Sequence, residues 1–426
     1  MNGLVIAAPM TGSGKTLVTL GLARALTRQG LRVQPAKAGP DYIDSRFLTR
    51  AAGRDALTLD AWAMAPDRLR MLAQGDDLLL VEGVMGLFDG ARDGTGSAAD
   101  LAEALGLPVV LVVNAESQGA SLAPLVHGFL RWRPGLQFGG VILNRVSTTR
   151  QEALLRQALS ATGVPVLGAL PKRDALKVPS RHLGLVLPDE LDHETLIDAA
   201  ADQVAAYIDL AAVLSLVKPA QAAQSAALRL PPLGQRIAIA RDDAFAFLYA
   251  HWLSDWRAAG AEIHFFSPLA DEPPRDADAI FLPGGYPELH AGRLALAMQF
   301  KLGLIAAAAR GALIYGECGG FMVLGETLTD ASGTPHAMVG LLPHSTSIAR
   351  PRRTLGYRRL RHASPLPFPA QLSGHEFHYS SSGPAGGTPL FAATDALGEP
   401  MAPMGLVEGR IMGSYAHVID RATTPP

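Results

Sequence analysis

One segment of the chain has the residue pattern of a nucleophile on a tight turn. Residues 313–317 are mostly apolar and of β type, and Cys318, Gly319 and Gly320 follow them before a helical pattern begins. Such a turn exposes a nucleophile beside the first backbone N–H groups of the helix, which stabilise both a thiolate and an oxyanion. A lone cysteine is more often a small buried hydrophobic residue, but a core cysteine needs no glycines around it. The pattern therefore favours Cys318 as a nucleophile.

A second segment has the pattern of a phosphate-binding loop. Residues 4–8 indicate a buried strand, residues 9–16 contain two glycines followed by Lys15 and Thr16, and a helical pattern follows. Backbone N–H groups at the helix start can bind phosphates, the lysine can reach the β- and γ-phosphates, and the threonine hydroxyl can hold Mg²⁺. Pro9 replaces the usual first glycine, but the flanking strand and helix keep the motif in its normal context. The loop residues expected to bind the nucleotide are Thr11, Gly12, Ser13, Gly14, Lys15 and Thr16.

Acidic residues lie at the ends of two further predicted strands. Asp41 and Asp44 come after the strand predicted over residues 31–37, and Glu82 ends the buried run of residues 78–81. Loops at the carboxyl ends of parallel strands form the ligand site, so these carboxylates should face the phosphates. Taken singly, each acid would more often be a helix cap or a solvated loop residue. Because three strand ends converge on one phosphate site, we expect Glu82 to be a second Mg²⁺ ligand.

Two other strand ends carry weaker signals. Asn144 ends the strand predicted over residues 140–143 and could bind a nucleobase edge, although a turn-forming asparagine fits equally well. Gly284 and Gly285 end the strand that precedes the cysteine strand. Together with Gly319 they could supply the N–H groups of an oxyanion hole, and a plain turn is the equal alternative.

A cysteine nucleophile needs a base, and histidines are the candidates. Those downstream of Cys318 are His336, His344, His362, His375, His378 and His417. We select His417 because it follows a short strand late in the chain, where the base is expected in a sheet of this order. A lone histidine is more often a packed structural residue, so spacing alone leaves the other five open.

Residues 374–380 contain His375, Glu376 and His378, which invites a metal-site interpretation. The alternation of a strand would place Glu376 and His378 on one face and His375 on the other, so we favour a half-buried strand.

A basic stretch precedes this strand, with no acidic residue inside it. Its arginines are Arg350, Arg352, Arg353, Arg358, Arg359 and Arg361. A solvated loop is the default interpretation. The alternative is a binding site for a substrate with many carboxylates, which suits the bidentate geometry of arginine, and its candidates are Arg350, Arg352, Arg353 and Arg358.

The elements that position these residues indicate an α/β protein with two domains. A chain of 426 residues is too long for one ordinary core. Residues 1–210 read as strands alternating with helices and form the predicted P-loop ATP-binding domain. Residues 211–234 are rich in Ala, Gln and Leu, contain three prolines, and are the predicted linker. Residues 235–426 begin a second parallel-sheet pattern, which contains Cys318.

The composition limits the classes of partner and the cellular compartment that we expect for this protein. With 48% hydrophobic and 18% charged residues, the chain is globular, and its net charge of −2 gives no argument for nucleic acid or a membrane as the main partner. A single cysteine excludes an internal disulfide framework, and the N-terminal residues lack a basic, cleavable leader, so we expect a cytoplasmic protein.

Taken together, these segments resemble the cobyrinic/hydrogenobyrinic acid a,c-diamide synthase family of the cobalamin pathway. The segments that carry the resemblance are residues 9–16, 39–44, 81–90, 181–185, 283–288, 316–320 and 374–380. The resemblance spans nearly the whole chain. It implies a dethiobiotin-synthetase-like ATP domain followed by a class I-type glutamine amidotransferase domain.

The resemblance also implies roles for particular residues. It places Asp41, Asp44, Glu82 and Asp89 in the site that binds ATP and Mg²⁺ and activates the substrate. Within that site we assign catalytic roles to Asp44 and Asp89, and Mg²⁺ to Thr16, Asp41 and Glu82.

The resemblance makes His417 the favoured base for Cys318, with one departure from the family pattern. Amidotransferases with a full triad carry Glu two residues after this histidine, and here that residue is Ile419, followed by Asp420. A group from elsewhere in the fold is therefore expected to orient His417.

The implied reaction is amidation of the a and c acetate carboxylates of hydrogenobyrinic or cobyrinic acid, with ATP as cosubstrate and Mg²⁺ as cofactor. ATP would convert each carboxylate to an acyl phosphate, and ammonia released from glutamine at Cys318 would displace the phosphate. We favour the metal-free ring. The sequence leaves the assembly open, with a homodimer as the form considered.

Two alternatives stay open from the sequence. Another tetrapyrrole could be the substrate, as in Ni-sirohydrochlorin a,c-diamide or cobyric acid synthesis. The chain could also be a partitioning-type nucleotide-binding module with a decayed amidotransferase domain. Partitioning-type ATPases carry a second lysine just after the first loop glycine, and Met10 stands there in this chain.

Overall fold

The computed structural model describes residues 1–173, 193–382 and 386–422. The chain forms two compact units, the first comprising Met1–Gly90 and Gly94–Ala227 and the second Ala91–Asp93 and Leu228–Pro426. The motif at residues 181–185 lies outside the described residues. In the part of the chain that is described, no helix is both long and apolar enough to cross a membrane.

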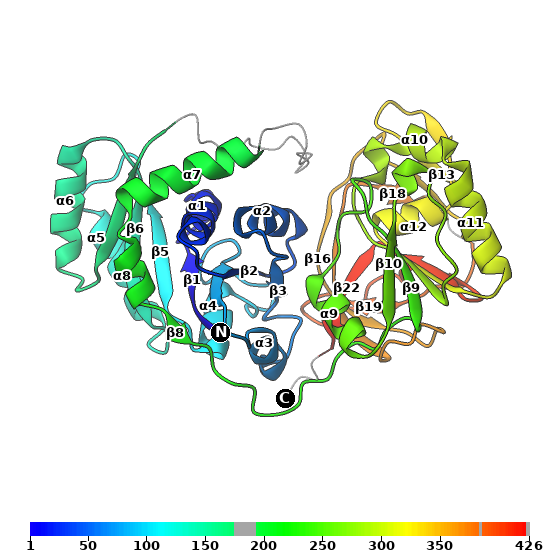
Figure 1. Cartoon of the computed structure of the whole chain (residues 1–426), viewed down its shortest axis with the longest axis horizontal. Helices are drawn as coiled ribbons and strands as arrows, with labels where there is room; N and C mark the ends of the chain where they lie inside the picture. Colours follow the sequence, from blue (N-terminus) through cyan, green and yellow to red (C-terminus); the bar gives the residue numbers. More distant parts are fainter. Residues whose placement is uncertain (174–192, 383–385, 423–426) are drawn as a thin grey trace. The chain divides into compact units, whose positions relative to one another are not determined.

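The first unit is built on an eight-stranded sheet in the order β3-β2-β4-β1-β5-β6-β7, with β8 paired to β1 (Figure 1). Its strands are β1 (Asn2–Ala7), β2 (Val33–Ala38), β3 (Leu57–Leu59), β4 (Leu78–Glu82), β5 (Val109–Asn114), β6 (Phe138–Val146), β7 (Val166–Pro171) and β8 (Lys218–Pro219). All the ladders are parallel except the one between β1 and β8. Continuous apolar runs such as β5 are typical of strands that are buried on both faces.

Helices connect these parallel strands. They are α1 (Lys15–Arg28), α2 (Tyr42–Ala52), α3 (Pro66–Leu72), α4 (Ala98–Leu105), α5 (Leu122–Trp132), α6 (Thr149–Ser160), α7 (His193–Tyr207) and α8 (Leu210–Ser215). An apolar core joins α1, α2 and α7 to the sheet, with Leu22, Leu48 and Val204 among its buried side chains. The carboxyl ends of β1, β2 and β4 therefore open toward the loops that carry the phosphate-loop and acidic motifs.

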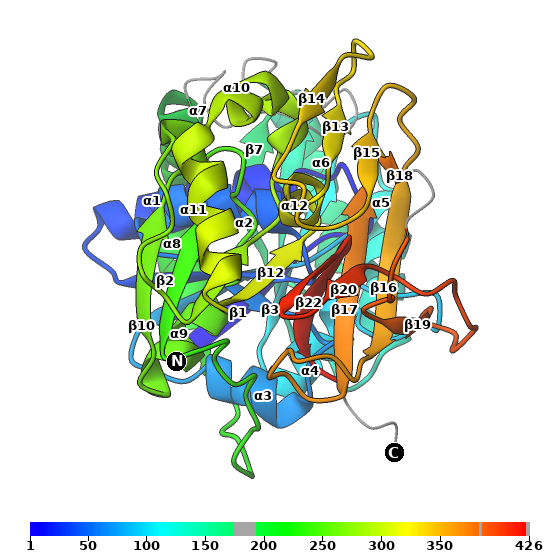
Figure 2. The ribbon, with the colours of Figure 1, turned by 90° about the vertical axis from the view of Figure 1, so that its right-hand side faces the viewer.

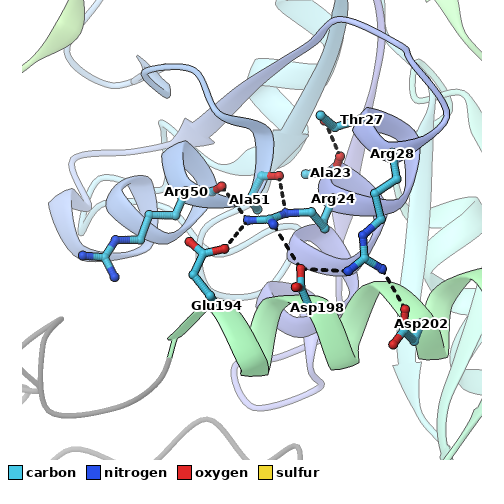
Figure 3. Close-up of polar contacts among 9 residues, drawn as sticks. All are labelled: Ala23, Arg24, Thr27, Arg28, Arg50, Ala51, Glu194, Asp198 and Asp202. Atoms are coloured by element: carbon cyan, nitrogen blue, oxygen red, sulfur yellow. Dashed lines mark hydrogen bonds and ion pairs between the residues drawn. The ribbon is translucent and has the colours of Figure 1, made fainter.

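Ion pairs fix the helix that follows the phosphate loop (Figure 3). From α1, Arg24 contacts Glu194 at 2.7 Å and Asp198 at 3.0 Å, and it also donates to two backbone carbonyls of α2. Arg28 contacts Asp198 at 2.9 Å and Asp202 at 2.7 Å. Contacts from α2 and α7 thus hold α1 in place.

The end of the first unit differs from the predicted linker. Part of the predicted segment, residues 211–219, belongs to α8 and β8 within this unit, and the two units divide after Ala227. Val213 is buried in the core, and Lys218 and Pro219 pair with Gly3 and Asn2. Burial and strand pairing thus order a stretch whose composition suggested a connector.

The second unit contains three sheets, ordered β10-β9-β11-β12-β21-β20, β14-β13-β15-β18 and β19-β16-β17-β22. The first six strands are β9 (Arg236–Ala240), β10 (Glu262–Phe266), β11 (Ala279–Leu282), β12 (Leu313–Glu317), β13 (Thr327–Thr329) and β14 (Pro335–Ala337). They are followed by β15 (Ser345–Ser347), β16 (Thr354–Arg361), β17 (Gln371–His378), β18 (Ser381–Ser382), β19 (Ala392–Thr394), β20 (Leu406–Glu408), β21 (Ile411–Ser414) and β22 (Ala416–Arg421). Figure 2 shows β17 beside β22, in agreement with their antiparallel register.

The helices of this unit cluster around the six-stranded sheet. They are α9 (Ala250–Ala258), α10 (Ala291–Leu296), α11 (Met298–Ala309) and α12 (Gly319–Leu324), with 3-10 turns η3 (Pro268–Ala270) and η4 (Pro287–Leu289). Residues 241–249 form a loop ahead of α9, in which Phe247 N–H donates to the Gly284 carbonyl at 2.9 Å. The parallel sheets of both units confirm the predicted α/β class.

Candidate active sites

The phosphate loop of the first unit has the predicted strand–loop–helix form. Gly12 and Gly14 have φ values of 83° and 93°, a left-handed conformation that glycine adopts without steric cost. Helix α1 begins directly after Gly14, which offers no side-chain cap. The first backbone N–H groups of α1 are therefore available to an anion at the helix N-terminus.

Lys15 and Thr16 point toward the loop that follows β4. Lys15 Nζ donates to the Met85 carbonyl at 2.6 Å, and Thr16 Oγ1 donates to Glu82 Oε1 at 2.6 Å. Met85 has a φ of 45°, so its carbonyl is held in an unusual backbone conformation. Burial, together with the charge of Lys37, lowers the pKa of Lys15. Two loops that are about seventy residues apart thus meet at the ammonium group that is expected to bind phosphate.

A buried lysine, absent from the predicted site, links the acidic residues. Lys37 Nζ lies 2.7 Å from Asp44 Oδ2 and 2.9 Å from Glu82 Oε1, and only 3% of the side chain is exposed. Burial alone would lower the pKa of Lys37, but Glu82 and Asp44 outweigh it and raise that pKa. The sequence signal was a charged residue inside an otherwise buried strand, β2.

Glu82 is buried and has one carboxylate oxygen without a hydrogen-bond partner in the described part of the chain. Its side chain is fully buried, and its Oε2 atom has no hydrogen-bond partner among the described residues. Burial raises the pKa of Glu82, and the ammonium of Lys37 opposes that rise. No group of three or more His, Cys, Asp or Glu side chains able to hold a metal occurs in the described ranges. The role of Glu82 as a Mg²⁺ ligand stays a prediction.

The other two acids of this site have structural partners. Asp41 caps α2, because its Oδ1 accepts from the N–H groups of Ile43 and Asp44 at 2.8 and 3.0 Å. Asp89 Oδ2 accepts from Gly86 N–H at 2.7 Å. A helix cap is the structural alternative that the sequence offered for Asp41. The metal role of Asp41 and the catalytic roles of Asp44 and Asp89 stay predictions.

Asn144 supports the phosphate loop. It is buried, its Nδ2 donates to the Ser13 carbonyl at 2.9 Å, and its Oδ1 accepts from Arg145 N–H at 3.0 Å. A Cβ atom on Gly14 would lie 2.0 Å from Asn144 Nδ2, so this contact requires glycine at position 14. The amide therefore bonds within the fold, and its contact with a nucleobase stays a prediction.

In the second unit, Cys318 occupies the turn between β12 and α12. Its φ of 47° and ψ of −105° are strained values for a residue with a side chain, as at a nucleophile elbow. The turn is tight, because a Cβ atom on Gly320 would lie 1.9 Å from the Leu282 carbonyl oxygen. Cys318 N–H donates to the Ser414 carbonyl at 2.8 Å, which anchors the turn to β21.

Three glycines that the sequence singled out converge on Cys318. A Cβ atom on Gly284 would lie 2.3 Å from His417 Cε1 and 3.2 Å from Cys318 Cβ, so Gly284 lies close to both side chains. A Cβ atom on Gly319 would lie 3.2 Å from Gly285 N. Gly285 N therefore lies close to Gly319, whose own N–H is bonded to the thiol, and the oxyanion-hole role of the three glycines stays a prediction.

His417 is the histidine that the fold brings beside Cys318. It lies on β22, is 1% exposed, and faces His375 across the ladder with β17. Burial, followed by the charges of His375 and His378, lowers the pKa of His417 to about 3. At neutral pH the ring is therefore uncharged, which is the form that accepts a proton.

The other histidine candidates have partners of their own. His336 pairs with Asp330 at 2.8 Å, and His378 pairs with Glu376 at 2.8 Å. His344 and His362 bond backbone carbonyls, and the His375 ring packs against Tyr357.

Glu317, which sequence reasoning did not assign to the site, contacts His417. The two side chains are buried, and Glu317 Oε2 lies 3.8 Å from His417 Nδ1. Glu317 Oε1 accepts from Tyr315 Oη at 2.8 Å and from Val418 N–H at 3.0 Å. Burial raises the pKa of Glu317 to about 8. As with Lys37, the signal was a charged residue inside an apolar strand.

Cys318 is buried, and its thiol rests in the neutral form. Burial is the main reason that the pKa of Cys318 is raised, and the carboxylate of Glu288 adds to it. The N–H of Gly319 acts in the opposite direction. Burial also raises the pKa of Glu288 to about 7. Forming a thiolate therefore requires a base beside the thiol.

The basic stretch divides into two groups, and this corrects one prediction. Arg358 is buried, and its Nε and Nη2 atoms contact Glu376 Oε2 at 2.9 and 2.8 Å. The ion pair keeps Arg358 within the fold, because the buried Glu376 carboxylate would be costly without a partner. Arg358 is therefore not a surface site for substrate. Arg350, Arg352 and Arg353 are exposed and stay candidates.

The motif at residues 374–380 forms a strand, as predicted. Glu376 and His378 are buried and bonded to each other, while His375 and Phe377 are half-buried. His378 also contacts Ser380, and its ring stacks on Tyr415.

Comparisons with known proteins match both units. Residues 4–186 match the CobQ/CobB/MinD/ParA nucleotide binding domain, and residues 236–424 match the CobB/CobQ-like glutamine amidotransferase domain. The chain is 54% identical to hydrogenobyrinate a,c-diamide synthase of Brucella abortus, over 99% of each chain. It is 51% identical to the protein of that name from Rhizobium meliloti, over 99% of each, and 50% identical to that from Rhodobacter capsulatus, over 98% of each. The chain therefore belongs to the hydrogenobyrinate a,c-diamide synthase family of glutamine-dependent amidating ligases.

Proposed function

We propose that this protein amidates the a and c acetate side chains of hydrogenobyrinic acid, with ATP as the energy source and glutamine as the nitrogen donor. The observation that carries the proposal is the identity of 50 to 54%, over nearly the full length, to relatives named for that reaction. Their name specifies the metal-free ring, which favours hydrogenobyrinic over cobyrinic acid. The contacts at Lys15 and Cys318 support two chemical steps.

The first step activates the carboxylate. A carboxylate resists amide formation because its leaving group would be oxide. A substrate carboxylate oxygen attacks the γ-phosphorus of ATP, ADP leaves, and an acyl phosphate forms. Ammonia then attacks the carbonyl carbon, the carbon–oxygen bond to phosphate breaks, and phosphate leaves. The ammonium of Lys15 and the N–H groups of the loop stabilise the charge on the transferring phosphoryl group.

The residues of the first unit fit Mg²⁺. The buried Glu82 Oε2 atom lacks a hydrogen-bond partner among the described residues, and the Thr16 hydroxyl contacts the other oxygen. Thr16 and Glu82 would hold the ion, with Asp41 as a further candidate, and the ion would neutralise phosphate charge. Lys37 favours the ionised form of Glu82, and Asp89 fixes the adjoining loop through Gly86 N–H.

The second step releases ammonia from glutamine. Cys318 gives its proton to His417 and attacks the side-chain amide carbon, and the N–H groups of Gly285 and Gly319 stabilise the oxyanion. His417 returns the proton to the nitrogen, the carbon–nitrogen bond breaks, and ammonia leaves a glutamyl thioester. Water, deprotonated by His417, hydrolyses the thioester and restores the thiol.

Product mass tests the proposal. The protein is incubated with glutamine, ATP, Mg²⁺ and, in parallel, hydrogenobyrinic acid, cobyrinic acid, the a,c-diamide or Ni-sirohydrochlorin. Conversion of two carboxylates of hydrogenobyrinic acid to amides is the expected result. Four further amides on the a,c-diamide would support cobyric acid synthesis, and amidation of Ni-sirohydrochlorin alone would support that substrate. No amide on any ring would support a nucleotide-binding module.

Two further expectations concern the setting of the enzyme. A homodimer and a cytoplasmic location stay predictions. Light scattering during size-exclusion chromatography measures the assembly, and cell fractionation measures the location.

A further inference from the structure

The carboxyl group that directly precedes the nucleophile is held in one orientation. Glu317 is the last residue of β12, and 2% of its side chain is exposed. One carboxylate oxygen, Oε1, accepts hydrogen bonds from Tyr315 Oη and from Val418 N–H. Val418 directly follows His417 on β22, so the same bond ties Glu317 to the strand that carries the base. The other oxygen, Oε2, is the one that faces His417.

Among the described residues, His417 is the only basic side chain that contacts the Glu317 carboxylate. Glu317 Oε2 lies 3.8 Å from His417 Nδ1, and no other Lys, Arg or His nitrogen of the described residues lies within 4.0 Å of the carboxylate. A hydrogen bond forms when this separation shortens by about 1 Å, and catalytic hydrogen bonds are often long before substrate binds. The two anchors leave Oε2 available for that movement.

Ile419, which stands at the position of the usual triad glutamate, bonds to a helix through its backbone carbonyl. Ile419 falls at an irregularity in the ladder between β17 and β22, where Ser373 pairs with Asp420 and Gly374 with Val418. The Ile419 carbonyl accepts from Trp252 Nε1 at 3.1 Å and is 3.0 Å from His251 Nε2. This part of β22 is therefore bonded to α9, which leaves the orientation of the base to another element.

We infer that Glu317 is a positioning residue that holds His417 in the tautomer protonated at Nδ1 and stabilises its imidazolium. The inference rests on the proposed glutaminase role of Cys318 and His417. In the attack step the thiol proton moves from Sγ to His417 Nε2, the proton on Nδ1 stays in place, and Glu317 Oε2 accepts a hydrogen bond from it. The nucleophile and the group that orients its base are then consecutive residues on one strand end.

The main test is Glu317→Gln, which preserves shape and removes the charge. The amide oxygen can still accept from Tyr315 and Val418, so a purely structural role would survive. Its Nε2 would instead donate to His417 Nδ1 and favour the wrong tautomer. We expect kcat for glutamine hydrolysis to fall by about 10²- to 10⁴-fold, with KM for glutamine changed by less than about threefold. Glu317→Asp, which retains the charge, should recover part of the loss.

The pH profile of cysteine alkylation separates positioning from structure. Cys318 is the only cysteine, so iodoacetamide reports its thiolate without interference. In Glu317→Gln the profile should move to higher pH, because the imidazolium that accompanies the thiolate loses its carboxylate. Glu262→Gln, at an exposed position on β10, is the matched control and should leave kcat and the profile as in the wild type. Thermal unfolding checks that each variant is folded.

The outcomes also separate this inference from the proposed function. If Cys318→Ala hydrolyses glutamine at the wild-type rate, both the glutaminase site and the role of Glu317 are wrong. If Cys318→Ala is inactive while Glu317→Gln keeps the wild-type kcat and alkylation profile, only the role of Glu317 is wrong. Loss of kcat in Glu317→Gln without a shift of the profile would show that the carboxylate does not act on the thiolate–imidazolium pair, and it would also overturn the inference.

Discussion

The two candidate sites handle charge in opposite ways. In the first unit, the buried ammonium of Lys37 lies between two carboxylates, and Lys15 lies beside them. In the second unit, burial raises the pKa of Cys318 and lowers that of His417, so the resting thiol and imidazole are neutral. The first site suits ligands that are already charged, such as phosphates. The second suits a reaction that creates charge only when a proton moves from thiol to imidazole.

Loss of the nucleophile should give the largest effect and should affect only one nitrogen source. We expect Cys318→Ser to lower glutamine-dependent amidation by on the order of 10⁴-fold or more, since serine at this turn lacks a comparable thiolate. Amidation with a high concentration of ammonium should persist. The measurement is amide formation with each nitrogen source, and loss of both activities would contradict a separate glutaminase unit.

Loss of the phosphate-loop lysine should give the reverse pattern. Lys15→Ala should lower amidation by about 10³-fold with glutamine or ammonium, because the transferring phosphoryl group loses a positive charge. Glutamine hydrolysis should stay measurable in the same preparation. Full ATP-driven amidation by this variant would show that the loop is wrongly assigned.

Charge pairing around Lys37 should contribute to the free energy of unfolding of the first unit. Lys37→Met would leave Asp44 and Glu82 without their shared cation and should lower the free energy of unfolding by about 3–5 kcal/mol. Denaturant unfolding of the full chain, followed through its first transition, measures the loss. Arg28→Met removes an exposed partner of Asp202 and should cost less than about 1 kcal/mol. Equal losses in the two variants would contradict the comparison.

The smallest predicted effect concerns neutral groups in the second unit. Burial lowers the pKa of His344 to about 4, and its ring stacks on Phe321. The unfolded chain binds this proton near its ordinary pKa of 6.5, so the stability contributed by His344 is present above pH 6.5 and is lost as the pH falls to about 4. His344→Gln should therefore reduce the slope of stability against pH in this window by up to about 1.4 kcal/mol per pH unit.

Thermal or denaturant unfolding at several pH values measures this slope. His127→Gln, at an exposed position on α5, is the control and should leave the slope unchanged. A slope in His344→Gln equal to that of the wild type would contradict the prediction.

Local patterns predicted the two reactive turns but not the partners of the groups on them. The strand, glycines and helix around Lys15 and Cys318 are adjacent in the sequence, so periodicity and turn chemistry were enough to locate them. The contacts of Lys37 and Glu317 join strands that are far apart in the chain. The sequence shows a charged residue in each strand but does not show which residue it pairs with. Arg358 was predicted as a substrate contact because its pairing with Glu376 across two strands is not visible in the sequence.

The position of β22 in the chain has a consequence for protein synthesis. The elbow at Cys318 is anchored by the carbonyl of Ser414, and the base lies on β22, the last strand of the described residues. Residues of the first unit, up to Ala227, leave the ribosome well before either strand. A nascent chain can thus complete its nucleotide-binding unit while its cysteine is still without a base. Under the proposed function, release of ammonia begins only after β22 has been made.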